Sequence, residues 1–180
     1  MNREQTMPDG GLYRPECEHD ACGVGLVVNI NGNKYHSVVE QGLCVREHMA
    51  HGGAEGSDNK AGDGAGILVQ IPHEFILLNG IPVPEKGRYG VGMVFLPRDG
   101  ADQQLFMQLV TEVVEEQGLR LTASRNVPVD SSILGADAAA PEPVIRQLFI
   151  VGCDDRQRLE ELLYIVRKRI EFRLAGSAIR

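Results

Sequence analysis

The sequence lacks three features that would assign it to a specialised class of protein. It has no excess of basic charge, because 18 Lys and Arg stand against 25 Asp and Glu and give a formal net charge of -7. This balance argues against nucleic-acid binding, which needs a basic surface. No apolar run approaches the roughly 20 residues of a membrane-spanning helix, and the N-terminus has no apolar core typical of a secretory signal. We therefore expect a cytoplasmic protein that binds neither nucleic acid nor membrane.

Cysteine is also scarce, with four residues in the whole chain. In a cytoplasmic protein, cysteines at irregular spacing are expected to be reduced thiols. Cys17, His19 and Cys22 have the spacing of half a zinc site, but no second Cys/His pair follows at short spacing, so we expect no metal. We expect Cys44 and Cys153 to be small, buried, apolar side chains.

The polarity of the chain changes after its first 21 residues. Residues 1–21 are polar, and we expect them to form an extended leader without regular structure. Residues 22–180 are long enough for one domain with a sizeable core. We expect strands at residues 23–30, 33–36, 66–71, 89–95, 119–125 and 145–151, and helices at 38–48, 73–78, 101–117 and after Asp154 or Asp155. Because strands and helices are mixed, and Asn31-Gly32 predicts a hairpin between the first two strands, we expect an α+β fold.

Two of these helices have clear apolar faces. In residues 101–117, the predicted inward stripe is Leu105, Leu109 and Val113, flanked by Phe106 and Val110. Gly118 is a typical helix stop. In the last helix the predicted inward side chains are Leu159, Leu162, Leu163, Val166 and Ile170. Its basic residues Arg167, Lys168, Arg169 and Arg173 suit the negative end of the helix dipole, and we expect them to be solvated.

A glycine-rich stretch, HGGAEGSDNKAGDGAG, covers residues 51–66. Its six glycines and two aspartates predict a loop with tight backbone turns. The GDGAG within it is similar to a phosphate cradle. However, it lacks the glycine order of known phosphate-binding loops, and a strand rather than a helix is expected after it. A small-molecule binding module built on this loop is therefore disfavoured.

Cys22 is the strongest candidate for chemistry in this sequence. It directly precedes a Gly-Val-Gly run. A cysteine is a nucleophile only as the thiolate, and it needs a base close by. Gly23 and Gly25 would let the substrate and neighbouring backbone approach closely. On this short motif alone, a structural role for the Cys-Gly-x-Gly strand start remains open.

Three sources could supply the base for Cys22. The available histidines are His19, His36, His48, His51 and His73. A helix N-terminus could lower the pKa of the thiol, although a strand is expected after Cys22. The third source is the α-amino group of Cys22 itself, which exists once the preceding peptide bond is cut and has an ordinary pKa of about 7.7–8.0.

Several segments together resemble one known family. They are LYRPECEHDACGVGLVVNI (12–30), VVEQGL (38–43), AGDGAGILVQIPHEF (61–75), YGVGMVFLP (89–97), RNVP (125–128), PVIRQLFI (143–150) and LYIVRKRIE (163–171). In sequence and order they are similar to the start of the large chain of glutamate synthases. That region is the class II glutamine amidotransferase domain, a member of the N-terminal nucleophile hydrolases.

The resemblance implies a fold, a processing step and a reaction. The fold would be part of a four-layer α/β/β/α sandwich. Removal of the propeptide Met1 to Ala21 would expose Cys22 as the first residue, and its thiolate would attack the side-chain amide of glutamine to release ammonia. In a complete synthase, the ammonia passes to separate synthase domains that carry FMN and an iron–sulfur cluster. We expect neither cofactor in this chain.

The sequence departs from the family pattern in two places. The family has His-Arg-Gly-Ala at the glycine loop, whereas here Gly52 occupies the arginine position. Loss of a charged donor aimed at an active-site group typically costs about 2–4 kcal/mol. The family domain also continues beyond the position of Arg180, into segments that grip the glutamine carboxylate and form the oxyanion hole.

Two functions follow from these observations. The first is the glutaminase part of a glutamate synthase, completed by further domains or chains of that enzyme. The second is a catalytically inactive, regulatory or assembly fragment of the same family. An uncut leader and an unreactive Cys22 would favour the second function.

Overall fold

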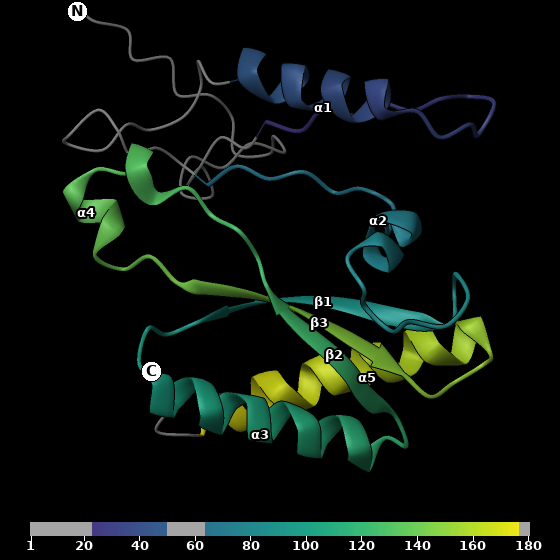
Figure 1. The fold of residues 1–180 in the computed structure, drawn as a ribbon, viewed down its shortest axis with the longest axis vertical. Helices are drawn as coiled ribbons and strands as arrows, with labels where there is room; N and C mark the ends of the chain where they lie inside the picture. The colour runs from purple at the N-terminus through teal and green to yellow at the C-terminus, as the bar shows by residue number, and fades with distance from the viewer. Residues whose placement is uncertain (1–22, 50–63, 177–180) are drawn as a thin grey trace, which may run out of the picture. The chain divides into compact units, whose positions relative to one another are not determined.

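A computed structural model describes residues 23–49 and 64–176 of the chain (Figure 1). The chain divides into two compact units, of which the first ends at Leu68 and the second begins at Val69. We describe each unit by itself. The prediction of a single domain over residues 22–180 stays a prediction.

The second unit is built on a three-stranded antiparallel sheet. Its strands are β1 (Tyr89–Leu96), β2 (Arg120–Asn126) and β3 (Val144–Val151). β3 lies in the centre and pairs with both neighbours, so the strand order is β1-β3-β2. All three strands were predicted from the sequence to within one residue at either end. The mixture of this sheet with helices confirms the α+β class.

Two long helices cover one face of this sheet (Figure 1). They are α3 (Gly100–Glu116) and α5 (Arg156–Ala175). The core between helices and sheet consists of Leu96, Phe106, Val110, Val113, Val114, Leu119, Leu148, Ile150, Leu159 and Val166. The predicted inward residues of α5 are confirmed, since Leu162, Leu163 and Ile170 also pack against this core.

The ends of both helices follow the local sequence. Asp99 caps α3 by accepting hydrogen bonds from the backbone N–H groups of Ala101 and Asp102. Gly118 follows α3 with a φ of 71°, a conformation that side chains with a Cβ rarely adopt. Asp155 caps α5 by accepting from the N–H of Arg158 at 2.7 Å, so the structure selects Asp155 over Asp154.

The inward stripe of α3 differs from the prediction by a small rotation. Phe106, Val110 and Val113 are buried, whereas Leu105 is 51% exposed. The apolar face of α3 is broad, and the pattern alone does not fix which line of residues lies at its centre. Packing against the sheet and α5 selects the line through Val110.

The basic residues of α5 are exposed to solvent and also form ion pairs. Arg169 donates to Glu116 of α3 at 3.0 Å, and Arg173 donates to the other carboxylate oxygen of Glu116 at 2.5 Å. Arg167 and Lys168 both bind Glu171 of their own helix. All four basic side chains stay exposed, so the expectation of a solvated basic end is confirmed, and α3 adds an acidic partner beside it.

A short helix, α2 (His73–Leu78), packs on the other face of the sheet. A second apolar cluster forms there from Ile76, Ile81, Tyr89, Phe149 and Val151. The prediction of one short helix at residues 73–78 is confirmed. The segment 130–143, predicted as a loop, contains the 3-10 turn η3 (Ser131–Ile133) and the short helix α4 (Ala136–Ala139).

In the first unit only part of the prediction forms. Helix α1 spans His36–His48 and so begins two residues before the predicted helix. The predicted turn is present, with Gly32 donating to the carbonyl of Asn29 and adopting a φ of 70°. However, residues 23–30 and 33–36 are not strands, so the predicted hairpin is wrong in this structure. Residues 66–71, which span the boundary between the two units, are not a strand either. A strand needs a second strand to which its backbone can hydrogen-bond. The apolar pattern of one segment favours a strand but does not identify the segment that pairs with it.

Within the described ranges, 23–49 and 64–176, no helix has both the length and the apolar character needed to cross a membrane.

Candidate functional site

The two residues that carry the sequence prediction lie outside the described residues. These are Cys22 and Gly52. The predicted leader, residues 1–21, and most of the glycine loop lie outside them too. The structure does describe the chain on the C-terminal side of Cys22, from Gly23 onward, and the helix that packs against it.

The two glycines after Cys22 lie against the C-terminal end of α1. A Cβ placed on Gly23 would be 3.2 Å from Met49 Sδ, and a Cβ on Gly25 would overlap Val45 Cγ1. Met49 itself caps α1, with its N–H directed at the carbonyls of Val45 and Arg46. The expected close approach at these glycines is therefore found, and the groups that approach are side chains of α1.

The opposite side of this segment carries exposed apolar residues. Val24 is 90% exposed and Leu26 is 86% exposed, whereas Val27 and Asn29 are partly buried. Exposure thus alternates along the segment as in an extended chain. One side of the segment contacts α1 and the other side presents an uncovered apolar stripe, formed by Val24, Leu26, Val28 and Ile30.

Three of the five candidate histidines are described. His36 lies 3.7 Å from Glu40, one turn along α1. His48 Nδ1 donates to the carbonyl of Cys44 at 2.8 Å and lies 3.6 Å from Cys44 Sγ. His73 belongs to the second unit. His19 and His51 lie outside the described residues, so a histidine base for Cys22 stays an untested alternative.

The two described cysteines differ in burial. Cys44 is exposed on α1, which corrects the prediction of a buried side chain. The cause is that α1 has no buried residue at all, so its apolar side chains do not form a core. Cys153 is partly buried and packs against the core of the second unit, in line with the prediction.

The second unit holds a polar pair that the sequence did not reveal. His73 Nδ1 and the hydroxyl of Tyr89 are 2.9 Å apart, and the two rings are tilted with centroids separated by 5.7 Å. Burial raises the pKa of Tyr89 above its ordinary value. The pair fixes the start of α2 to β1, across 16 residues of sequence.

Arg125, in the RNVP segment, makes a second tie on the same unit. Its Nε donates to Gln147 Oε1 on β3 at 2.8 Å, and its guanidinium lies 5.3 Å from the ring centroid of Phe75 in α2. Such a cation–aromatic contact is modestly stabilising. Arg125 thus links β2, β3 and α2.

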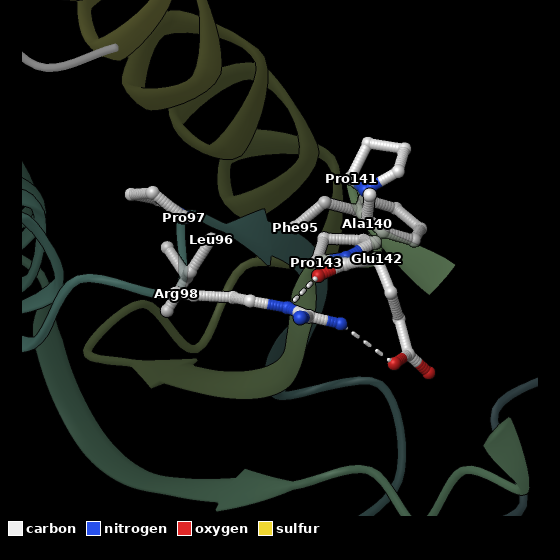
Figure 2. Close-up of a pocket in the computed structure, with 8 residues that line it drawn as sticks. All are labelled: Phe95, Leu96, Pro97, Arg98, Ala140, Pro141, Glu142 and Pro143. Atoms are coloured by element: carbon white, nitrogen blue, oxygen red, sulfur yellow. Dashed lines mark hydrogen bonds and ion pairs between the residues drawn. The ribbon is translucent and has the colours of Figure 1, made fainter. Parts of the chain in front are cut away.

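A hollow of about 380 Å³ lies where β1 ends and β3 begins (Figure 2). Arg98 crosses it and donates from Nε to the carbonyl of Glu142 at 2.9 Å and from Nη2 to Glu142 Oε2 at 3.0 Å. Nη2 also donates to the carbonyl of Ala139. The remaining wall is apolar, with Phe95 and three prolines. Since its charged groups bind each other, this hollow offers a structural tie rather than a reactive centre.

Among residues 23–49 and 64–176, no three His, Cys, Asp or Glu side chains gather as a metal site would require. A cluster of the Cys₄ type needs four thiolates. The two described cysteines, Cys44 and Cys153, belong to different units of the chain. The described residues therefore do not fit an iron–sulfur cluster.

Comparison with known proteins gives a consistent result. A family model described as glutamine amidotransferases class-II matches residues 22–179. The chain is 41% identical over 176 residues to the glutamate synthase [NADPH] large chain of Bacillus subtilis, covering 95% of this chain and 12% of the relative.

Two further relatives agree with this match. Ferredoxin-dependent glutamate synthase 2 of Synechocystis is 39% identical over 165 residues, covering 88% of this chain and 10% of the relative. Glutamate synthase [NADH] of Saccharomyces cerevisiae is 38% identical over 186 residues, covering 94% and 9%. The chain therefore spans only about a tenth of the length of these relatives.

Proposed function

This chain belongs to the class-II glutamine amidotransferase family, and from that membership we propose that it provides the nucleophile-bearing part of a glutaminase site in a glutamate synthase. The observation that carries the proposal is the extent of the family match, which begins at Cys22 and runs to residue 179. The relatives that share this region are named glutamate synthases.

The proposed reaction transfers the glutamyl group of glutamine to Cys22 and then to water. The thiolate attacks the side-chain amide carbon, the carbon–nitrogen bond breaks, and the nitrogen leaves as ammonia after taking up a proton. Water then attacks the thioester, which releases glutamate and restores the thiol. The ammonia would serve glutamate synthesis in the rest of the enzyme, where FMN and an iron–sulfur cluster would belong to other domains.

The base in this proposal is the α-amino group of Cys22. Its ordinary pKa of about 7.7–8.0 lies close to neutral pH, so it can take the thiol proton and pass it to the leaving nitrogen. The group is free only after residues 1–21 have been removed. Leader removal is therefore part of the proposed function.

We further propose that the domain is completed as a four-layer α/β/β/α sandwich. Support comes from the face of the β1-β3-β2 sheet opposite α3 and α5, which α2 covers only in part. On that face Met93 is 50% exposed and Phe95 is 65% exposed. A second sheet over this face would bury them, as sheets in sandwiches do. The uncovered apolar stripe of residues 24–30 has the alternation that a strand of a second sheet requires.

Gly52 sets a limit on the proposed activity. It supplies no side chain where the family has an arginine, and an oxyanion-type donor is typically responsible for about 2–4 kcal/mol. We therefore propose that turnover needs groups from further domains or chains of a glutamate synthase. Covalent labelling of Cys22 is a more direct test than ammonia release, because it requires only the nucleophile and its base.

The experiment combines intact mass with labelling by a chloroketone analogue of glutamine, from which the thiolate displaces chloride. We expect the protein expressed from residues 1–180 to be purified with the mass of residues 22–180 and to take up one label, located at Cys22. Cys22→Ala should take up none. Cys44→Ala is the matched control, because Cys44 is an exposed thiol to which the proposal gives no role, and it should label like the wild type.

The opposite result favours the second function, an inactive or regulatory fragment. A mass that retains residues 1–21, together with no labelling of Cys22 above the rate of Cys44, would overturn the proposed nucleophile.

A further inference from the structure

Gly25 contacts Val45 so closely that no side chain larger than hydrogen fits at position 25. Neither Gly23 nor Gly25 is among the described glycines with positive φ, which are Gly32, Gly80, Gly87, Gly118 and Gly152. Backbone conformation therefore does not explain why glycine stands at positions 23 and 25. Space does, because a Cβ on Gly25 would overlap Val45 Cγ1 and lie 3.7 Å from Met49 Cε.

We propose that Val45 and Met49 of α1 are positioning residues, which hold the backbone immediately after Cys22 and thereby set where the nucleophile lies. They rest on Gly23 and Gly25, and Gly23 is the covalent neighbour of Cys22. This inference depends on the proposed function for its catalytic meaning, but the contact itself does not.

Among the described residues, α1 is the main element that contacts the segment after Cys22. Val24 and Leu26 point away from the helix and are almost fully exposed. Movement of Val45 or Met49 would therefore pass directly into the chain that carries Cys22. Reactive geometry is sensitive to such movement, since a displacement of about 1 Å can slow a reaction by roughly 100-fold.

Gly25→Ala tests whether the close contact with α1 matters for labelling. Adding Val45→Ala tests whether the side chain of Val45 is the group that the new methyl group meets. The added methyl group of Gly25→Ala should push the segment away from α1 and slow Cys22 labelling by about tenfold or more. In the double variant, Val45→Ala removes the atom that the new methyl group meets, so labelling should return to within about threefold of the wild type. Recovery by a second substitution excludes a simple loss of folding.

Gly42→Ala is the matched control on α1. A Cβ at Gly42 would meet nothing within 4 Å, so the same chemical change falls in open space. We expect its labelling rate and unfolding temperature to match or exceed those of the wild type, because alanine favours a helix over glycine. All variants are made in the full chain.

Two measurements separate the inference from the proposed function. The first is the labelling rate of Cys22 at saturating chloroketone, with the half-saturating concentration recorded separately. A positioning role lowers the maximal rate and leaves the half-saturating concentration nearly unchanged. The second is the thermal unfolding of the same variants, which requires no reactive cysteine and reports whether Gly25 and Val45 interact.

Each outcome decides one point. Non-additive unfolding together with a rescued labelling rate supports the inference. Non-additive unfolding with unchanged labelling in Gly25→Ala overturns the positioning role and leaves a purely structural contact. Additive unfolding overturns the contact itself. Failure of the wild type to label overturns the proposed function, and the unfolding data then still decide whether the contact exists.

Discussion

The two units of this chain differ in how many of the helices and strands predicted from the sequence are present in the structure. In the second unit, the strands predicted at 89–95, 119–125 and 145–151 and both long helices form, and the sheet has core residues on both faces. Among the described residues of the first unit, 23–49 and 64–68, one helix and one turn form, and that helix buries no residue. What differs among the described residues is that each strand of the second unit pairs with another strand, whereas residues 23–30 pair with none.

The strand pairs of the second unit illustrate this difference. β3 finds β1 and β2 on its two sides, and α3 and α5 cover one face. Residues 23–30 have an equally regular alternation, yet no described segment pairs with them. An isolated strand gains nothing from its pattern, because its backbone groups hydrogen-bond equally well to water.

The largest expected effect comes from removing a buried side chain in the second unit. Phe149 is fully buried in the cluster beneath α2. Phe149→Ala should lower the free energy of unfolding by about 3–5 kcal/mol, the usual cost of such a cavity. Chemical denaturation followed by circular dichroism measures this change.

Leu26→Ala is the matching variant in the first unit. Because Leu26 is exposed there, its substitution should change stability by about 0.5 kcal/mol or less. A cost of several kcal/mol at Leu26 would break the comparison between the units. It would also support the proposed sandwich, since only a covered Leu26 can lose that much.

Much of the second unit was predictable because its signals are local. Asp155 and Gly118 mark helix ends through their own backbone bonds and conformation. Ties across the sequence were not predictable. His73 and Tyr89 are 16 residues apart, and Arg125 and Gln147 are 22 apart. No period or motif links such residues before the strands bring them together.

The candidate site was predictable in a different way. The residues around Cys22 predict it as the nucleophile, and this stays a prediction, although the family match begins at that residue. The contact of Gly25 with Val45 was anticipated only as a need for close approach, because a glycine indicates that space is required without naming the neighbour. The prediction that Cys44 is buried was wrong, because burial depends on tertiary packing, which the sequence pattern of a helix does not specify.

A smaller effect is expected where α5 approaches the sheet. A Cβ at Gly90 of β1 would overlap the side chain of Leu163, whereas a Cβ at Gly92 would lie 4.0 Å from Leu148 Cβ. Gly90→Ala should therefore cost about 1–3 kcal/mol through overpacking. Gly92→Ala, on the same strand and face, should be close to neutral.

Denaturant titration of these two variants sharpens the comparison between the units. A neutral Gly90→Ala would mean that Leu163 or α5 can shift to make room for the methyl group at no cost, which would weaken the contrast in packing between the units. Combining Gly90→Ala with Leu163→Ala should cost less than the sum of the two single changes, because both act on one contact.

The smallest expected effect concerns the ion pairs between α3 and α5. Hydrogen bonds from Arg173, assisted by Arg169, hold the pKa of Glu116 below its ordinary value. A carboxylate with a lowered folded pKa stabilises the folded state above the ordinary glutamate pKa, and this stabilisation is lost as the pH falls through the folded value. Because the group is exposed, Glu116→Gln should lower the unfolding temperature at pH 7 by about 2 °C or less.

Glu115→Gln provides the control for Glu116, since it makes the same change one residue away. Both variants should be measured by thermal unfolding from pH 7 to pH 3 and again in high salt. The difference between Glu116→Gln and the wild type should disappear toward pH 3 and shrink in high salt, because salt screens exposed charges. If the difference in unfolding temperature persists at pH 3, Glu116 stabilises the protein through packing. The ion pairs between α3 and α5 would then make no measurable contribution to stability.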